Sequence, residues 1–226
     1  MSVGEVDVLR WLHILAMVYW LGGEWGVFQT SYNIMNPTCS MAERKRHLET
    51  AYRIDIMART GIISLLPLGL HMGHIYGLQP LGGTWLVGMW CVYGLWFALV
   101  WSMFVWRETD RGILLGKFDE AFRFLLIPTL FAVGIASLLG LGPLTVGPGT
   151  YWYAAKLTLY AFTLCIGLGL RYIMRAWTRR FRILAAGPDA VQEAALTREF
   201  AYGRLLAYVY WVTIAGICFL GSTKPF

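Results

Sequence analysis

Three histidines and one lysine are the residues of this sequence that could do chemistry inside a membrane. His13, His71 and His74 lie in long apolar segments, and Lys156 lies near the start of another. A neutral imidazole about 9 Å inside a membrane helix loses its hydrogen bonds to water and needs a partner, so it is a candidate ligand for a metal. The alternative is an imidazole that only bonds a carbonyl group or a neighbouring helix.

The composition sets the class of protein that must position these residues. Hydrophobic residues make up 58% of the 226 residues, aromatic residues 15% and charged residues only 14%. Apolar segments of roughly 20 residues are typical of polytopic helical membrane proteins. We therefore expect an all-α fold, a single integral-membrane domain over residues 1–226 that forms a bundle of six transmembrane helices. The predicted segments are residues 7–30, 54–78, 84–106, 122–143, 151–177 and 200–221.

The first segment is predicted to be a retained helix. Glu5 and Asp7 precede it, where a cleaved signal peptide would carry a basic run.

The four cysteines are scattered, with neither a CxxC pair nor a CxxCH motif. We therefore expect no disulfide, zinc ribbon, iron–sulfur cluster or covalently attached haem.

The basic residues predict how the bundle is oriented. The side of the predicted bundle that carries the termini has only three basic residues, Arg10, Lys156 and Lys224. The positive-inside rule therefore puts both termini outside the cytoplasm. The net charge of +6 is thus an orientation signal that calls for membrane lipid and no nucleic-acid partner. Three charged segments on the other side, the last counted from Arg171 to Glu199, carry thirteen of the 19 Lys and Arg residues: Arg44, Lys45, Arg46, Arg53, Arg107, Arg111, Lys117, Arg171, Arg175, Arg179, Arg180, Arg182 and Arg198.

This orientation brings the candidate residues to one depth. His71 and His74 are predicted roughly 6 to 10 Å below the outer surface, on one face of their helix. His13 lies at a similar depth on an antiparallel helix, and Lys156 lies at the same level. His47, in a predicted cytoplasmic loop, is an ordinary surface residue.

Two imidazoles from antiparallel membrane helices are the usual axial ligands of haem b. The macrocycle needs an apolar slot, and its propionates need a cation near the interface. We expect His13 and His71 to be the axial pair, His74 to bond a propionate or ligate a second haem, and Lys156 to pair with a propionate. Aromatic side chains, which crowd membrane interfaces in any case, are predicted at the same level: Trp11, Trp20, Tyr76, Trp85, Trp90 and Tyr153.

Copper is the alternative chemistry. The run from His71 to His74 contains Met72, and Met17 and Met57 lie in other parts of the apolar segments. Imidazole and thioether ligands suit Cu(I). However, Met72 points about 100° away from His71 on a helix. A copper or small-solute transporter is therefore the second hypothesis.

Three short motifs resemble a known family. The stretch LHILAMVYWLGG, with Trp20 seven residues after His13, is similar to the first helix of the membrane protoporphyrinogen IX oxidases and of the related copper-resistance D membrane domains. WYAAKLTL resembles their lysine-containing helix, and STKPF resembles their C-terminus. The resemblance implies a haem-ligating role for His13, an essential role for Lys156 and a match of Lys224 to the terminal lysine. Those oxidases have four spans, whereas six are predicted here. The resemblance therefore implies a haem b protein rather than one particular reaction.

These expectations lead to one functional hypothesis. We expect a cytochrome b-like integral protein of the bacterial cytoplasmic (inner) membrane, linked by electron transport to the quinone pool and to other membrane or extracytoplasmic redox subunits. Either a membrane oxidoreductase or a non-catalytic electron-transfer subunit fits. The cofactors would be at least one haem b and a quinone.

The cytoplasmic half contains a second set of candidates. Glu24 lies deep in the first segment, and Asp55, Arg59 and Arg123 lie near the inner ends of two others. A buried carboxyl group is costly unless it is paired or protonated. We expect Glu24 to form an ion pair with one of the arginines; the alternatives are a proton carrier or a donor set for a quinone head group.

Overall fold

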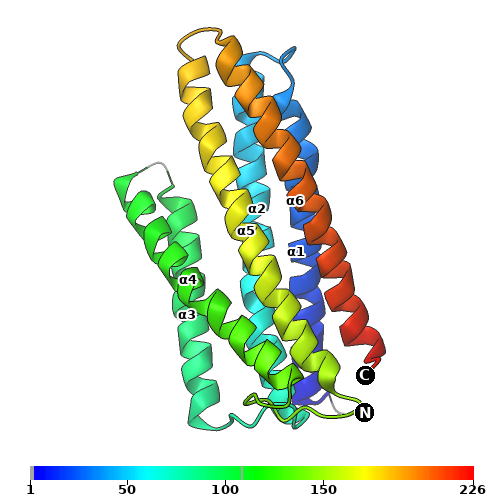
Figure 1. Ribbon diagram of the computed structural model, residues 1–226. Coiled ribbons are helices and arrows are strands. Elements are labelled where there is room, and N and C mark those ends of the chain that lie inside the picture. The colour runs from blue at the N-terminus through cyan, green and yellow to red at the C-terminus, as the bar shows by residue number, and fades with distance from the viewer. Residues whose placement is uncertain (1–2, 108) are drawn as a thin grey trace.

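The structure is a computed structural model that describes residues 3–107 and 109–226, and this part of the chain is all-helical. The helices run alternately up and down the bundle, and both termini lie at the same end (Figure 1). Six helices are described: α1 (Glu5–Met35), α2 (Met41–Ile75), α3 (Thr84–Val105), α4 (Asp110–Leu138), α5 (Tyr151–Leu184) and α6 (Ala190–Thr223).

Helices α2 to α6 are long and apolar enough to cross a membrane. Helix α1 has 31 residues, more than the roughly 20 needed to span the hydrocarbon core. It is not one of these five, and Arg10, His13 and Glu24 interrupt its apolar sequence. The fold class is therefore an all-helical protein with five apolar helices of membrane-spanning length.

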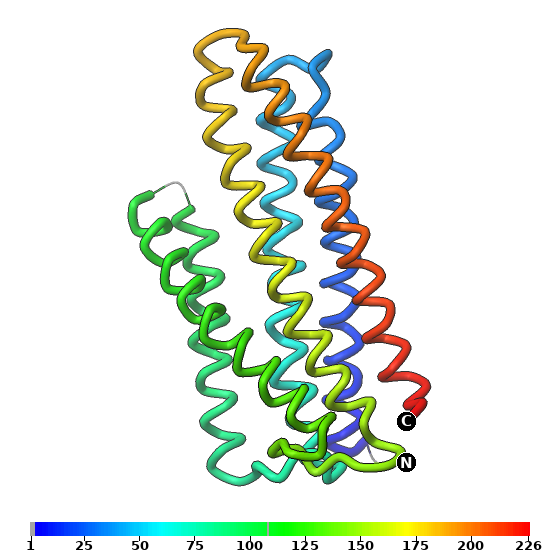
Figure 2. Tube along the Cα trace, in the orientation of Figure 1, coloured from blue at the N-terminus to red at the C-terminus, as the bar shows by residue number. Residues whose placement is uncertain are grey.

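Helices α1, α2, α5 and α6 extend past the α3–α4 hairpin at the end far from the termini (Figure 2). The helices continue there beyond the predicted apolar segments because both connections end in good caps. Ser40 and Glu43 form a capping box at the start of α2. Asp189 accepts hydrogen bonds from the backbone N–H groups of Val191 and Gln192, at 2.9 and 3.1 Å, at the start of α6.

This extension has a core of its own. Ile34, Trp177 and Leu196 belong to a buried cluster separate from the main core of the bundle. The buried Arg44 guanidinium contacts both carboxylate oxygens of Glu193, at 2.5 and 3.0 Å, and donates to the Ile34 carbonyl at 2.8 Å. The segments predicted as polar loops are thus largely helical and packed together.

Close packing of α1 on α2 sets the direction in which the α1 side chains point. A Cβ atom at Gly61 would lie 2.7 Å from the Trp20 backbone nitrogen, and one at Gly23 would lie 2.8 Å from the Ala58 Cβ. Small residues at these positions let the two backbones approach closely, as is common in membrane bundles. The His13 side of α1 therefore faces α2.

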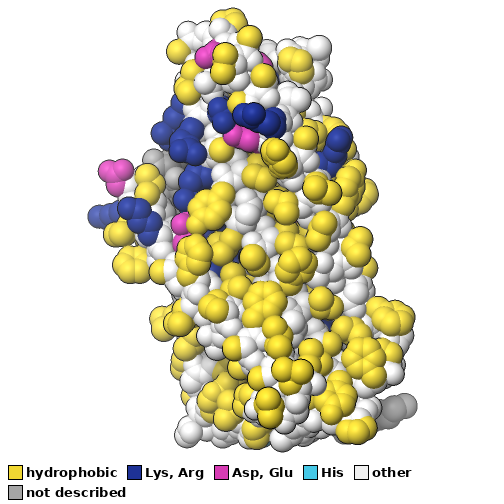
Figure 3. Space-filling view, in the orientation of Figure 1, with side chains coloured by type: hydrophobic (Ala, Val, Ile, Leu, Met, Phe, Trp, Pro, Cys, Tyr) yellow, Lys and Arg dark blue, Asp and Glu magenta, His cyan; other side chains and the backbone are white. Residues whose placement is uncertain are grey.

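The surface divides into an apolar part and a basic belt. Yellow hydrophobic side chains cover most of the lower part of Figure 3, and Lys and Arg side chains gather nearer the end far from the termini. Leu95 and Leu125 are 74% and 69% exposed. Apolar side chains this exposed are expected where lipid covers the protein.

Candidate functional site

A cavity of about 560 Å³ lies between α1, α2, α5 and α6, toward the end that carries the termini. We call it the histidine cavity. Its volume is within the roughly 300–1,000 Å³ that cofactor and small-molecule sites usually have. The residues that line it include Arg10, His13, Met17, Trp20, Met72, Tyr76, Tyr153, Lys156, Tyr160 and Lys224.

His13 faces this cavity from α1. Its ring packs beside Gly69 of α2, where an added Cβ would lie 3.5 Å from the His13 Cε1 atom. The Nδ1 atom is buried and has no hydrogen-bond partner within residues 3–107 and 109–226. A buried imidazole without partners is costly. His13 thus has the environment of a residue that binds something in the cavity.

Three cationic side chains surround the same space. Lys156 enters from α5, and its Nζ atom lies where a Cβ on Gly221 would come within 2.7 Å. Arg10 donates to the Tyr76 hydroxyl at 2.9 Å. Lys224 lies 5.5 Å from the centre of the Tyr76 ring, a distance at which cation–π attraction operates. A ligand with carboxylate groups would find complementary charge here.

Buried aromatic side chains close the inner end of the cavity. Trp20 is fully buried, and its Nε1–H donates to the Tyr210 hydroxyl at 2.9 Å. Tyr160 donates to the Ile62 carbonyl at 2.8 Å. Since all these polar atoms are paired, the aromatic groups form a fixed apolar wall that excludes water.

His71 does not lie in the histidine cavity with His13. Its Nδ1 accepts a hydrogen bond from Trp90 Nε1 at 3.3 Å, and its Nε2 lies 3.3 Å from a carboxylate oxygen of Glu5. Gly69 and Met72 are on the cavity face of α2, and His71 is turned about 100° from Met72. Equal depth along the bundle axis therefore did not bring the two predicted axial ligands together.

His74 also lies outside this cavity. Its ring packs against Gly82 in the α2–α3 connection, and its Nδ1 is buried with no partner in the described part of the chain. His47 is partly exposed and lies on α2 rather than in a loop. The residues that the structure describes contain no group of three or more His, Cys, Asp or Glu side chains that could hold a metal ion.

The predicted aromatic residues separate in the same way. Trp20, Tyr76 and Tyr153 line the histidine cavity, whereas Trp90 lies beside His71. Trp11 is 61% exposed on the outside of α1. Sequence reasoning missed Arg10 as a cavity residue, although its position three residues before His13 places it on the same helical face.

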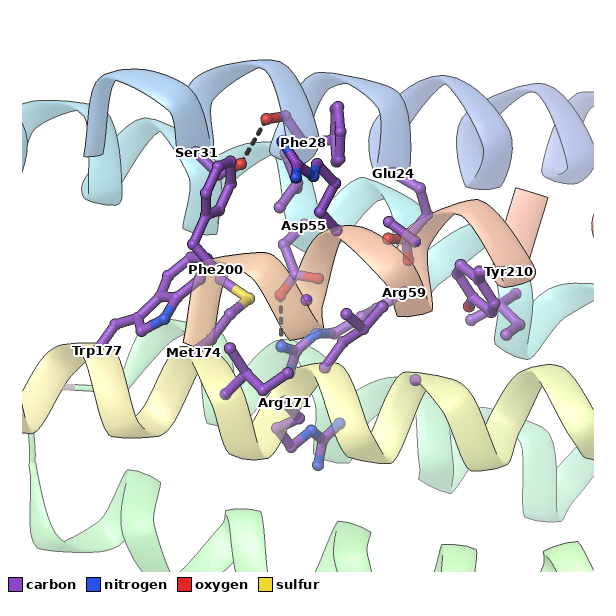
Figure 4. Close-up of a pocket in the computed structure, with 18 of the residues that line it drawn as sticks. Glu24, Phe28, Ser31, Asp55, Arg59, Arg171, Met174, Trp177, Phe200 and Tyr210 are labelled. Atoms are coloured by element: carbon purple, nitrogen blue, oxygen red, sulfur yellow. Dashed lines mark hydrogen bonds and ion pairs between the residues drawn. The ribbon is translucent and has the colours of Figure 1, made fainter. Parts of the chain in front are cut away.

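A second, smaller cavity of about 90 Å³ is lined by residues of α1, α2, α4, α5 and α6. Figure 4 shows these side chains. We call this space the arginine cavity. Arg59, Arg123 and Arg171 line it together with Glu24 and Asp55. Tyr210, the partner of Trp20, also lines it, so this one hydrogen-bonded pair lies between the two cavities.

Arg59, Arg123 and Arg171 already have acidic partners. Arg59 forms an ion pair with Asp55. Asp119, which is fully buried, accepts from Arg123 at 3.1 Å and from Arg171 at 2.5 Å. Figure 4 draws no hydrogen bond or ion pair to Glu24. The expected ion pair between Glu24 and one of these arginines is therefore not formed.

Asp119 and Arg171 were not among the predicted site residues. Arg171 was assigned to a cytoplasmic loop, but it lies in α5 with a side chain only 11% exposed. The spacing of Asp119 and Arg123, four residues apart, was the available signal, because such residues are neighbours on a helix.

Comparisons of this chain with protein-family models, with curated proteins and with solved structures gave no match.

Proposed function

We propose that the histidine cavity binds haem b, that His13 would hold its iron, and that the protein transfers electrons as a membrane oxidoreductase or redox subunit linked to the quinone pool. The observation that carries this proposal is the surroundings of His13. In the described part of the chain it is the one imidazole that lines the cavity, and one of its nitrogens is buried without a partner.

The other residues of the cavity fit the same group. A haem needs an apolar slot for its ring and cations for its propionates, and Lys156, Arg10 and Lys224 are available as those cations. When bound, haem b supplies reversible one-electron chemistry at its iron. The protein's part is to hold the ring through His13, to neutralise the propionates and to keep water out with Trp20 and Tyr160.

Copper or small-solute transport of the copper-resistance D type is the second candidate. It is favoured by the thioethers of Met17 and Met72, which line the cavity with His13 and would suit Cu(I). A reduced-minus-oxidised optical spectrum of the purified protein distinguishes the two. A b-type alpha band supports haem; a colourless protein that retains copper supports transport.

We also propose that all six helices cross the bacterial cytoplasmic membrane with both termini outside. The basic belt and the position of the termini at the opposite end support this orientation. A reporter fused after Phe226 should be active outside the cytoplasm, and one inserted in residues 185–189 should be active inside. Activity of both reporters on the same side would contradict the six spans.

Replacing Lys156 with methionine tests the propionate contact. Lys156→Met should keep haem binding and lower the reduction potential, because loss of a nearby positive charge favours the oxidised, more positive iron. Redox titration of the haem-loaded protein measures the shift. Lys117→Met is the matched control, since Lys117 is an exposed residue of α4 far from the cavity residues, and its potential should not change. An unchanged potential in Lys156→Met would remove Lys156 from the haem site.

A further inference from the structure

Glu24 is the feature of the arginine cavity that the haem site does not use. It lies within α1 and lines the cavity without an ion pair or hydrogen bond to the residues drawn in Figure 4. Ionisable residues inside membrane helices usually face the bundle interior or a water-filled cavity and often mark proton pathways. The titratable and charged groups that line this cavity from the other helices are Asp55 and Arg59 of α2, Arg123 of α4, Arg171 of α5, and Arg204 and Tyr210 of α6.

The charges around Glu24 allow its carboxyl group to be either ionised or protonated. Arg59 is engaged by Asp55, and Arg123 and Arg171 share Asp119. These arginines outnumber the two aspartates by one, so an ionised Glu24 would be balanced by the remaining positive charge. Because no arginine is committed to Glu24, protonating it breaks no ion pair.

The cavity has room for the water that proton exchange requires. A volume of about 90 Å³ can hold several water molecules, and the polar side chains of the wall supply their hydrogen bonds. Arg204 lines the cavity and is exposed, so the cavity reaches the surface of the bundle at α6. Proton exchange requires that water enter along the Arg204 side chain and reach Glu24.

The other end of the cavity is closed. Tyr210 is almost fully buried and accepts the hydrogen bond of Trp20, whose ring belongs to the wall of the histidine cavity. The path from Arg204 to Glu24 thus ends at the Trp20–Tyr210 pair. It brings an exchangeable proton to the wall of the histidine cavity without opening that cavity to water.

We propose that the arginine cavity is a proton-exchange site and that Glu24 is the group that binds the proton. The Glu24 carboxylate takes a proton from a hydronium ion in the cavity, so that one O–H bond forms on the carboxylate as one breaks in the hydronium ion. Release is the reverse step, and neither needs an oxidant or a reductant. The proposal is independent of what binds beside His13.

Infrared spectroscopy of the full chain in phosphatidylcholine vesicles tests this site. The carbonyl band of a protonated carboxylic acid should appear as the pH is lowered from about 9 to about 5, the range in which buried carboxyl groups titrate. It should shift when H₂O is replaced by D₂O and be lost in Glu24→Gln. Glu49→Gln is the control, because Glu49 is paired with Arg53 and Arg107, and it should keep the band.

Three results would overturn the proposal: no such band at any pH, a band that D₂O does not shift, or a band that survives in Glu24→Gln. If Glu24→Gln does not fold, Glu24→Asp replaces it, since it keeps the carboxyl group. The band should then move in frequency, and an unmoved band would assign it to another residue. Loss of the haem spectrum in variants of the histidine cavity would not change what the infrared band of Glu24 shows.

Discussion

Replacing Asp119 with asparagine should lower the free energy of unfolding by about 3–5 kcal/mol, the usual cost of removing one partner of a buried ion pair. Its side chain is fully buried and binds three groups: Arg123 at 3.1 Å, Arg171 at 2.5 Å and Trp96 Nε1 at 2.8 Å. These bonds join α3, α4 and α5. The variant would leave two nearly buried guanidinium groups facing each other without a counter-charge.

Denaturant titration of the detergent-solubilised protein measures this loss. Glu120→Gln is the matched control, because it makes the same chemical change at the next residue. The Arg175 partner of Glu120 is half exposed, so the expected loss is only about 0–1 kcal/mol. Equal losses in the two variants would show that the buried triad does not hold the helices together.

The fold class could be predicted because long apolar segments have few ways to fold in a membrane. Every predicted segment corresponds to a helix, and the turn at Gly83 before α3 lies where the apolar segment was predicted to begin. The helix ends far from the termini could not be placed by hydropathy. The polar residues after Ser40 and Asp189 form capped helices whose buried faces pack together only when four helices meet.

Half of the candidate site could be predicted from depth along the helices. His13 and Lys156 were expected at one level, and both line the histidine cavity. Depth does not report the direction in which a side chain points around its helix. His71 has the right depth, but the face of α2 that meets His13 is set by Gly69, two residues earlier and about 200° away.

The environment of Glu24 could have been read from residue spacing. Asp55 and Arg59 are four residues apart, as are Asp119 and Arg123, and pairs at this spacing meet on a helix. Arg59 and Arg123 thus each have a carboxylate partner on their own helix. The third partner, Arg171, comes from α5 and could not be assigned without the packing of the helices.

The haem proposal makes different predictions for the two histidines. His13→Ala should abolish haem binding, because it removes the imidazole that faces the cavity. His71→Ala should keep it, because the structure pairs His71 with Trp90 and Glu5 instead. This differs from the sequence-based expectation, in which both substitutions would destroy the site.

Adding imidazole separates a lost ligand from a lost fold. In His13→Ala the space left by the side chain lies beside Gly69 and opens to the cavity, so free imidazole can take the place of the missing ligand. The haem band should return when imidazole is added to the folded variant. A variant that merely misfolds would not recover it.

The reduced-minus-oxidised optical spectrum of the wild-type protein, compared with those of His13→Ala and His71→Ala, tests the central claim most directly. We expect a b-type alpha band in the wild-type protein and in His71→Ala, and no band in His13→Ala until imidazole is added. An unaltered haem spectrum in His13→Ala would contradict the claim that the histidine cavity is a haem site.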